Sequence, residues 1–400
     1  MFSSIDKPVI YRYYKSNNRL FTGNNELGGF KMIIFGLDLG NKQTKLFSNK
    51  TLSNEENKVE GKVLPSHFLY YDNLGNADTA IFGNKLNISK YKTEFDEEEY
   101  AWGPDLHKVH NNENFLDTIG FEKRYSTHEF KLLANFALGE LAKDYDAKNN
   151  FLTVKVVTGV PSDDFNESSV KDLINVLDGR HTITIDDISY TIDVKEVQVI
   201  PQSVGTVYNE LLNNQGEINP EKEHYLEEEI TVVDIGGGTI LIDTLKNMNL
   251  ATKTQFTTGI YTLYDMVIER AKAKGSEYSS LTAYDVEVIL REGDDTEGYF
   301  FKPNKNVSLD ITQIVQNVRK RYTKELINKI NKTKKSTSST DTMLITGGGA
   351  NLVEKDEIKN RFEFVLFVEN SEIANSMGFF KYGMAVMNSE DEEAAATAEE

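Results

Sequence analysis

The stretch IIFGLDLGNKQTKLF, residues 33–47, decides the fold, because its pattern returns as ITVVDIGGGTILID at residues 230–243. In each copy an apolar run rich in β-branched residues reaches Asp-Leu-Gly or Asp-Ile-Gly, passes through polar or glycine residues and becomes apolar again. This pattern predicts a strand, a tight turn and a second strand. Backbone N–H groups that line such a turn bind anions such as phosphate, and the aspartate supplies a hard oxygen for a cation. We therefore expect the two turns to bind one nucleotide from opposite sides.

Length and composition indicate a globular protein with two lobes. A chain of 400 residues exceeds what one hydrophobic core usually supports, and 39% hydrophobic and 27% charged residues are ordinary proportions. The absence of cysteine excludes disulfides and thiolate chemistry and is compatible with a reducing cytoplasm. The net charge of -19 argues against direct DNA binding over a broad surface. The same negative charge leads us to expect that charged partners are basic proteins. No apolar run approaches the roughly 18 residues that a membrane span needs, and we expect a cytoplasmic protein.

Helical and strand patterns alternate along the chain, which predicts the α/β class. Thr127 is a suitable N-cap for a helix, and its apolar positions follow the helical period at residues 130, 133, 134, 137, 138 and 141. A buried-type strand is predicted at 152–158, and an amphipathic helix at 311–330. Another buried-type strand, 343–346, leads into a third glycine turn at 347–350. The second half thus repeats the organisation of the first.

The three glycine-containing turns are candidates for a nucleotide site, although they match neither of the commonest nucleotide motifs. No Gly-Lys-Ser/Thr follows a glycine-rich turn, which excludes a Walker A motif. The segment after Gly238 has strand character, which excludes a Rossmann fingerprint. An isolated Asp-x-Gly turn is often purely structural. The joint occurrence of the turns in this order, flanked by buried-type strands, nevertheless predicts a nucleotide site.

Basic residues gather on the predicted helix 311–330 and in the loop after it, which is unusual in an acidic protein. They are Arg319, Lys320, Arg321, Lys324, Lys329, Lys332, Lys334 and Lys335. This cluster is either a docking surface for an adaptor protein or DNA, or a solvated helix face that runs into a Lys/Ser/Thr loop.

The chain resembles the actin, Hsp70 and sugar-kinase ATPase superfamily, and it is most similar to bacterial actin-like proteins of the ParM type, which partition plasmids. Residues 38–45 resemble the first phosphate motif, 234–239 the second, 346–350 the adenosine motif and 200–203 the connecting segment. Arg124-Tyr125-Ser126 and Gly378-Phe379-Phe380 also resemble the ParM group.

The resemblance spans residues 32 to about 388 and implies an actin-like fold, in which two duplicated α/β lobes surround a central nucleotide cleft. The first lobe would comprise 32–200, with the helix 371–388 packed back on it, and the second lobe 201–370. Residues 1–31 would form a leader or N-terminal extension before Met32, the expected natural start. Residues 389–400 would form an acidic tail, and we expect both ends to be disordered.

The resemblance also implies a role for each site residue. Asp38 and Asp234 would hold Mg²⁺ through its waters, and Gln202 would orient the attacking water, so these three are the predicted catalytic residues. Lys45 would neutralise charge that builds up on the phosphates. The bound nucleotide would be ATP or GTP. Its predicted contacts are Gly40, Asn41, Lys42, Gln43, Thr44 and Lys45 in the first turn, Gly236, Gly237, Gly238 and Thr239 in the second, and Gly347, Gly348, Gly349 and Ala350 in the third.

The implied function is that of a Mg²⁺-dependent ATPase that polymerises into cytoskeletal filaments and segregates plasmid or phage DNA through a DNA-binding adaptor. One position departs from the ParM pattern, because ParM has a glutamate where Gln202 stands, whereas actin has a glutamine. The alternatives are an Hsp70-like ATPase, a sugar-kinase-like ATPase, and a nucleotide-binding filament scaffold with little turnover. Neither direct DNA binding nor membrane association is expected.

Overall fold

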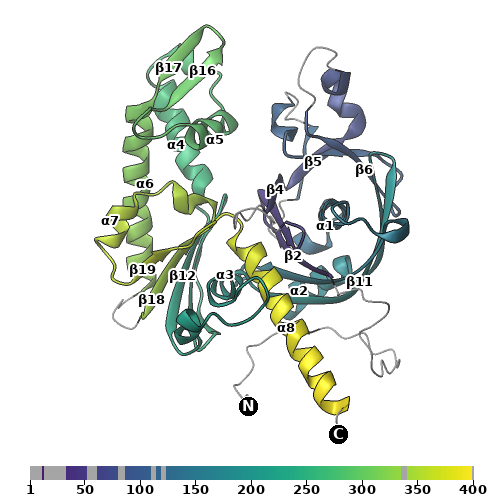
Figure 1. Cartoon of the computed structure of the whole chain (residues 1–400). Helices are drawn as coiled ribbons and strands as arrows, with labels where there is room; N and C mark the ends of the chain where they lie inside the picture. The colour runs from purple at the N-terminus through teal and green to yellow at the C-terminus, as the bar shows by residue number, and fades with distance from the viewer. Residues whose placement is uncertain are drawn as a thin grey trace. The chain divides into compact units, whose positions relative to one another are not determined.

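The computed structural model describes residues 11–12, 33–51, 61–79, 86–109, 114–118, 123–334 and 340–398, and the chain divides into two compact units (Figure 1). Unit 1 comprises Met1–Tyr225 and Ile373–Glu400, and unit 2 comprises Leu226–Glu372. The sequence predicted lobe boundaries after residues 200 and 370, which would place helix α3 (Gln202–Leu211) in the second lobe. In the structure α3 belongs to unit 1. None of the described helices is long and apolar enough to cross a membrane.

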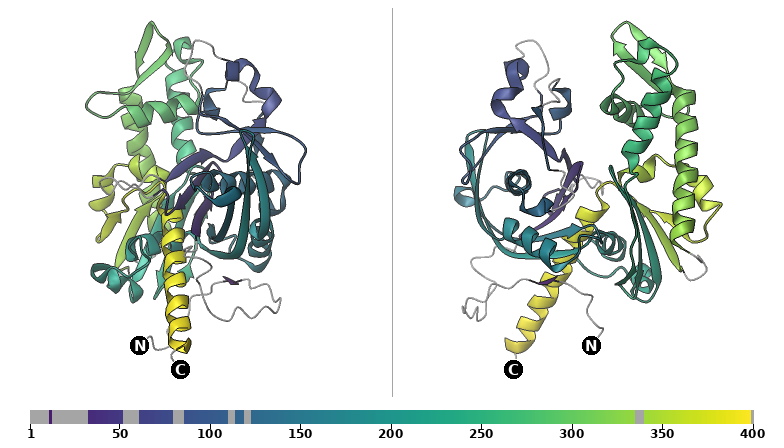
Figure 2. Two further views of the ribbon diagram at one scale, coloured as in Figure 1. Left: turned by 45° about the vertical axis from the view of Figure 1, so that its right-hand side comes forward. Right: turned by 180° about the vertical axis from the view of Figure 1, so that it is seen from behind.

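In the described part of unit 1, eleven strands form one large sheet that curls around a helix (Figures 1 and 2). The strands are β1 (Tyr11–Arg12), β2 (Ile33–Leu39), β3 (Gln43–Ser48), β4 (Lys62–Pro65), β5 (His67–Tyr70), β6 (Ser89–Thr93), β7 (Tyr100–Trp102), β8 (Leu116–Asp117), β9 (Phe151–Val160), β10 (Gly179–Ile185) and β11 (Ile188–Pro201). Their order is β4-β3-β2-β9-β11-β10-β6-β7-β5-β8, and β1 pairs with β11. The pairs β2–β9 and β9–β11 are parallel, and the other neighbours are antiparallel.

The helix inside this sheet, α1 (His128–Ala142), is buried on all sides from Leu132 onward, whereas His128 and Lys131 in its first turn are exposed. Thr127 caps its N-terminus as predicted, because the Thr127 hydroxyl accepts a hydrogen bond from the Phe130 N–H at 3.2 Å. The sequence predicted one apolar face, but Leu132 and Phe136 outside that face are also fully buried. The part of the helix that the curled sheet covers presents no face to water, which explains the almost continuous apolar sequence from residue 132 to residue 142.

Helix α8 (Ala374–Ala398) returns the end of the chain to unit 1 and packs on α3, β2, β3 and β9. A Cβ added to Gly378 would lie 1.8 Å from the Gly205 carbonyl oxygen, so α8 and α3 meet backbone to backbone. This close contact explains why α3 belongs to unit 1. The remaining helix of this unit, α2 (Glu167–Leu177), packs against β11 and α1.

The structure differs from the sequence prediction at the C-terminal end. Helix α8 continues through Ala398, so residues 389–398, which were predicted to form a disordered tail, are helical. Alanine and glutamate are strong helix formers, and the segment contains neither glycine nor proline to end the helix. Of the predicted extension 1–31, only Tyr11–Arg12 lies among the described residues, where it pairs with Val199 and Gln198. The disorder of that extension stays a prediction.

In the described part of unit 2, six strands form a second sheet with the order β14-β13-β12-β18-β19, and β15 pairs with β13. The strands are β12 (Glu229–Ile235), β13 (Ile240–Lys246), β14 (Asn249–Thr252), β15 (Gln255–Phe256), β18 (Thr342–Thr346) and β19 (Val365–Phe367), and a separate hairpin consists of β16 (Phe300–Asn304) and β17 (Val307–Asp310). The helices are α4 (Ile260–Lys272), α5 (Ala283–Glu292), α6 (Thr312–Thr333) and α7 (Lys355–Lys359). Apolar side chains of β12 and β13 form one core with those of α4, α5 and α6.

Candidate functional site

The β2–β3 turn, residues 40–42, brings the predicted site residues of unit 1 together. Asp38 pairs with Lys45 across the hairpin and is 1% exposed. Its carboxylate accepts hydrogen bonds from Lys45 Nζ at 3.4 Å and from Gln202 Nε2 at 3.0 Å. Gln202 is the first residue of α3, 164 positions after Asp38. Two predicted site side chains, those of Lys45 and Gln202, therefore meet at the buried carboxylate of a third, Asp38.

Buried donors hold the carbonyl oxygens of this turn. The Arg124 guanidinium donates to the carbonyl oxygens of Leu39 (2.8 Å), Gly40 (2.8 Å) and Thr118 (2.9 Å). The Ser66 hydroxyl donates to the same Gly40 oxygen at 2.7 Å. Burial lowers the pKa of Arg124 from its ordinary value. The sequence assigned no role to Arg124 or Ser66, because residues 84 and 26 positions from Gly40 share no local pattern with it.

The β12–β13 turn of unit 2, residues 236–239, is held in a comparable way by the start of α4. The Gly236 N–H donates to the Thr239 carbonyl at 2.9 Å, which closes the turn. The carbonyl oxygens of residues 236, 237 and 238 accept hydrogen bonds at 3.0, 3.0 and 3.1 Å from the N–H groups of Ile260, Tyr261 and Gly259, respectively. A Cβ on Gly259 would lie 2.4 Å from the Gly237 oxygen, so this position requires glycine. The sequence prediction missed Gly259, because a single glycine before a helix is common.

Asp234 is the penultimate residue of β12 and lies directly beside the third glycine turn. It is 8% exposed and lies opposite Thr346 in the parallel pair β12–β18, so the carboxyl ends of both strands meet. Gly347 follows with a φ of +85°, and a Cβ there would lie 2.3 Å from Asp234 Oδ1. A Cβ on Gly349 would lie 2.4 Å from Ile235 Cγ2. The predicted role of these glycines is to make room for adenosine; independently of it, packing within unit 2 requires glycine at both positions. Gly348 and Ala350 lie in the short 3-10 helix η8 (Gly348–Asn351).

Each unit therefore assembles its own part of the predicted site. Unit 1 combines Asp38, Lys45 and Gln202 with the turn 40–42, and unit 2 combines Asp234 with the turns 236–239 and 347–350. In both turns protein donors hold backbone carbonyl oxygens, and the opposite side of each peptide carries an N–H that suits an anion. Within the described residues, no group of three or more His, Asp or Glu side chains is arranged to hold a metal ion directly.

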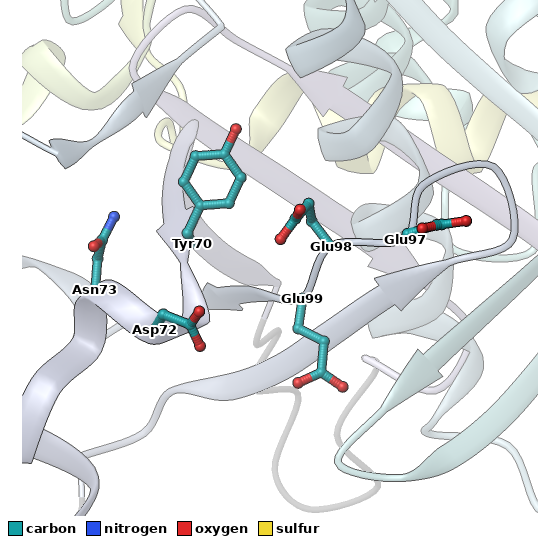
Figure 3. Close-up of a pocket in the computed structure, with 6 residues that line it drawn as sticks. All are labelled: Tyr70, Asp72, Asn73, Glu97, Glu98 and Glu99. Carbon is teal, nitrogen blue, oxygen red and sulfur yellow. The ribbon is translucent and has the colours of Figure 1, made fainter.

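A surface pocket of unit 1, with a volume of about 480 Å³, is lined by other residues (Figure 3). They come from two chain segments and are Tyr70, Asp72, Asn73, Glu97, Glu98 and Glu99. Four carboxylates around one pocket repel phosphate groups. We therefore exclude this pocket as the site of a triphosphate.

Of the predicted basic cluster on α6 and the loop after it, Lys335 lies outside the described residues, and the remainder is partly neutralised by acidic side chains of unit 2. Arg319 pairs with Asp295 at 3.0 Å and with Glu354 at 3.4 Å, and Arg321 pairs with Glu325 at 2.9 Å. These pairs reduce the positive charge that an anionic partner would meet. They favour the solvated helix face over a docking surface for DNA.

Comparison with known proteins identifies the family. The model of the N-terminal domain of actin like proteins matches residues 36–205, and the model of the Alp7A C-terminal domain matches residues 229–378. The chain belongs to the actin-like proteins. No match is found among curated protein sequences.

Solved structures confirm the actin-like fold that the sequence predicted. The apo psk41 ParM protein is 23% identical, with a TM-score of 0.68 over 90% of this chain and 99% of that chain. A 15-stranded ParM filament from Clostridium botulinum is 20% identical, with a TM-score of 0.64 over 88% and 99% of the two chains. Bacillus thuringiensis ParM with ATP is 16% identical, with a TM-score of 0.64 over 88% and 98%.

Proposed function

We propose that the protein is an actin-like ATPase that polymerises with bound nucleotide into cytoplasmic filaments and segregates plasmid or phage DNA through a DNA-binding adaptor. The observation that carries this proposal is the meeting of Lys45 and Gln202 at the buried carboxylate of Asp38, beside a turn whose carbonyls are tied to the protein. The family supports the rest, because one similar ParM was solved as a filament and another with ATP.

The two turns suit the phosphates of a nucleoside triphosphate, ATP or GTP. In unit 1 the donors are the amides of residues 40–44 and Lys45, whose side chain is 15% exposed. In unit 2 they are the amides of residues 237–239, where glycines leave the backbone uncovered, because the Gly236 N–H already donates to the Thr239 carbonyl. Gly347 to Ala350 are assigned to the adenosine. Asp38 and Asp234 would hold Mg²⁺ through its waters, an arrangement that this ion favours, and the bound ion would neutralise phosphate charge.

Gln202 is the residue we assign to the attacking water. Its Nε2 donates to Asp38, which fixes the side chain and leaves Oε1 as the atom that accepts a hydrogen bond from water. A neutral amide orients a water without acting as a strong base. The protein must therefore lower the activation barrier of nucleotide hydrolysis mainly by positioning the attacking water. Lys45 adds a positive charge where negative charge develops on the phosphates.

A filament scaffold with little turnover is the second candidate function. It is favoured by the amide at position 202, because the ParM pattern has a carboxylate there that can also accept a proton. Both candidates share the nucleotide site and the polymer, and they differ in the rate of phosphate release.

The test combines pelleting with phosphate release on the full chain. We expect Mg²⁺ with ATP or GTP to produce sedimentable polymer, followed by phosphate release that candidate sugars do not accelerate. Polymer with almost no phosphate release would favour the scaffold. Phosphate release that requires a sugar would favour a sugar kinase, and nucleotide turnover without polymer at any salt concentration would contradict the filament proposal.

A further inference from the structure

Arg124 lies at the back of the first turn, in the short 3-10 helix η4 (Arg124–Ser126) that precedes α1. The side chain is 7% exposed, and its guanidinium lies 4.8 Å from the centre of the Phe130 ring. Its Nη1 and Nη2 atoms each donate at 2.8 Å to consecutive carbonyl oxygens, those of Leu39 and Gly40. The planar fork of arginine is suited to two parallel acceptors, which a lysine ammonium cannot match.

The grip on the Gly40 carbonyl sets the direction of the next amide. The peptide bonds of the described chain are trans, and in a trans peptide the C=O and the following N–H point in opposite directions. The Gly40 oxygen faces two buried donors, Arg124 and the Ser66 hydroxyl. The N–H of Asn41 must therefore point away from them, out of the protein side of the turn.

The duplicated turn of unit 2 reaches the same orientation by other means. Leu39 pairs with Thr44 and Ile235 with Ile240, so Gly40 corresponds to Gly236 in the two hairpins. The Gly236 carbonyl oxygen accepts a hydrogen bond at 3.0 Å from the backbone N–H of Ile260, at the start of α4. In unit 1 a side chain replaces that helix terminus. Both copies thus hold the same carbonyl from behind, which indicates that the orientation matters for the site and not only for one hairpin.

The charge of Arg124 adds to this effect. The hydrogen bonds from its Nε, Nη1 and Nη2 atoms end on carbonyl oxygens, which carry no net charge, while the nearby carboxylates of Asp38 and Asp164 offset part of the positive charge. An arginine stays protonated in proteins, so a positive charge sits behind the turn. An anion bound in front of the turn experiences that charge in a partly buried, weakly screened environment.

We propose that Arg124 is a positioning residue for phosphate binding: together with Ser66 it holds the Gly40 carbonyl, directs the Asn41 N–H toward the phosphate and supplies a buried positive charge behind it. This inference rests on the proposed nucleotide function. It concerns the part of the site in unit 1. It predicts that changes at Arg124 weaken binding of the triphosphate and leave binding of the nucleoside unchanged.

The test compares Arg124→Lys with two matched variants of the full chain. Arg180→Lys makes the same change at an exposed arginine of unit 1, whose side chain is 65% exposed. Ser66→Ala removes the second donor to Gly40 and leaves the guanidinium in place. Calorimetric titration with Mg-ATP and Mg-GTP, and with adenosine and guanosine, measures each Kd, and circular dichroism measures the melting temperature of the nucleotide-free proteins.

We expect Arg124→Lys to raise the Kd for the triphosphate by about 10- to 100-fold, the range for hydrogen bonds to a charged group, with the Kd for the nucleoside within about twofold of wild type. Ser66→Ala should raise the triphosphate Kd by about three- to tenfold, and Arg180→Lys should leave it unchanged. If Arg124→Lys fails to fold, Ser66→Ala decides the question by the same comparison of triphosphate with nucleoside.

An equal loss of triphosphate and nucleoside affinity, or a lower melting temperature with unchanged affinities, would show a merely structural role and overturn the inference. Wild-type affinity for the triphosphate in both Arg124→Lys and Ser66→Ala would overturn it as well. A wild-type protein that binds neither ATP nor GTP would instead refute the proposed nucleotide function, and the inference with it.

Discussion

Replacing Gly347 with alanine perturbs the contact between the second and third turns of unit 2. Gly347 has a φ of +85° and a ψ of 166°, a region that is almost restricted to glycine. The new Cβ would lie 2.3 Å from Asp234 Oδ1 and 2.5 Å from the Ile235 carbonyl oxygen. Real Cβ contacts are not this short, so the strand end that carries Asp234 must move.

Two costs add up in this variant. Holding a non-glycine residue in that backbone region costs on the order of 1–3 kcal/mol. Displacing packed backbone to admit an extra methyl group typically costs about 1–3 kcal/mol more. We therefore expect the free energy of unfolding of unit 2 to fall by about 2–6 kcal/mol. Nucleotide affinity should fall as well, because Asp234 is among the displaced residues.

Urea denaturation followed by far-UV circular dichroism measures this loss, and Gly238→Ala is the matched control. A Cβ on Gly238 meets no heavy atom within 4 Å, so that variant should stay within about 0.5 kcal/mol of wild type. Fluorescence of Trp102, the chain's only tryptophan, reports the unfolding of unit 1. The urea midpoint measured by fluorescence should therefore shift less than the midpoint measured by circular dichroism. If Gly347→Ala destabilised the protein no more than Gly238→Ala, the packing argument would be refuted.

Three further variants test the site and its surroundings. Asp234→Ala should abolish Mg²⁺-dependent hydrolysis, and unchanged phosphate release would refute its assignment. Gln202→Ala should slow hydrolysis by at least about tenfold while sparing assembly; a variant that hydrolyses normally but fails to pellet would contradict the role given to Gln202. Burial lowers the pKa of His67 to about 4 from 6.5, so the unfolded chain takes up a proton first as the pH falls. The free energy of unfolding should therefore decrease between pH 6.5 and about 4, by up to about 3 kcal/mol, and His67→Phe should reduce that slope in urea titrations. Equal slopes for the two proteins would count against this assignment.

The elements that the sequence predicted well are those with a local cause. The two Asp-bearing hairpins follow from alternating β-branched runs around a polar turn, and the structure has them as β2–β3 and β12–β13. The α1 helix follows from its N-cap at Thr127. The meeting of Asp38, Lys45 and Gln202 was predicted through the family resemblance, because no spacing rule connects residues 164 positions apart.

What the sequence did not predict depends on contacts between distant segments. The curling of the sheet around α1 is visible only once β5 and β7 are paired, and nothing in either strand specifies the other. Arg124 and Ser66 converge on Gly40 from different elements, and Gly259 is required only because a turn 20 positions earlier touches it. In physical terms, such residues are selected by steric fit and hydrogen-bond satisfaction in the folded state, which leave no periodic pattern.

The return of α8 to unit 1 has a consequence for folding during synthesis on the ribosome. Unit 2 is inserted between the two segments of unit 1, so about 150 residues must be synthesised after the first segment and before α8 begins. At roughly 5–20 residues per second this takes about 7–30 s. During that time β2, β3 and β9 lack the helix that covers them, and Gly36 lacks the α8 backbone on which it packs. Unit 2 can therefore finish folding while the first segment of unit 1 still has apolar surface in contact with water. Such surface favours misassembly of the growing chain, which a chaperone would prevent.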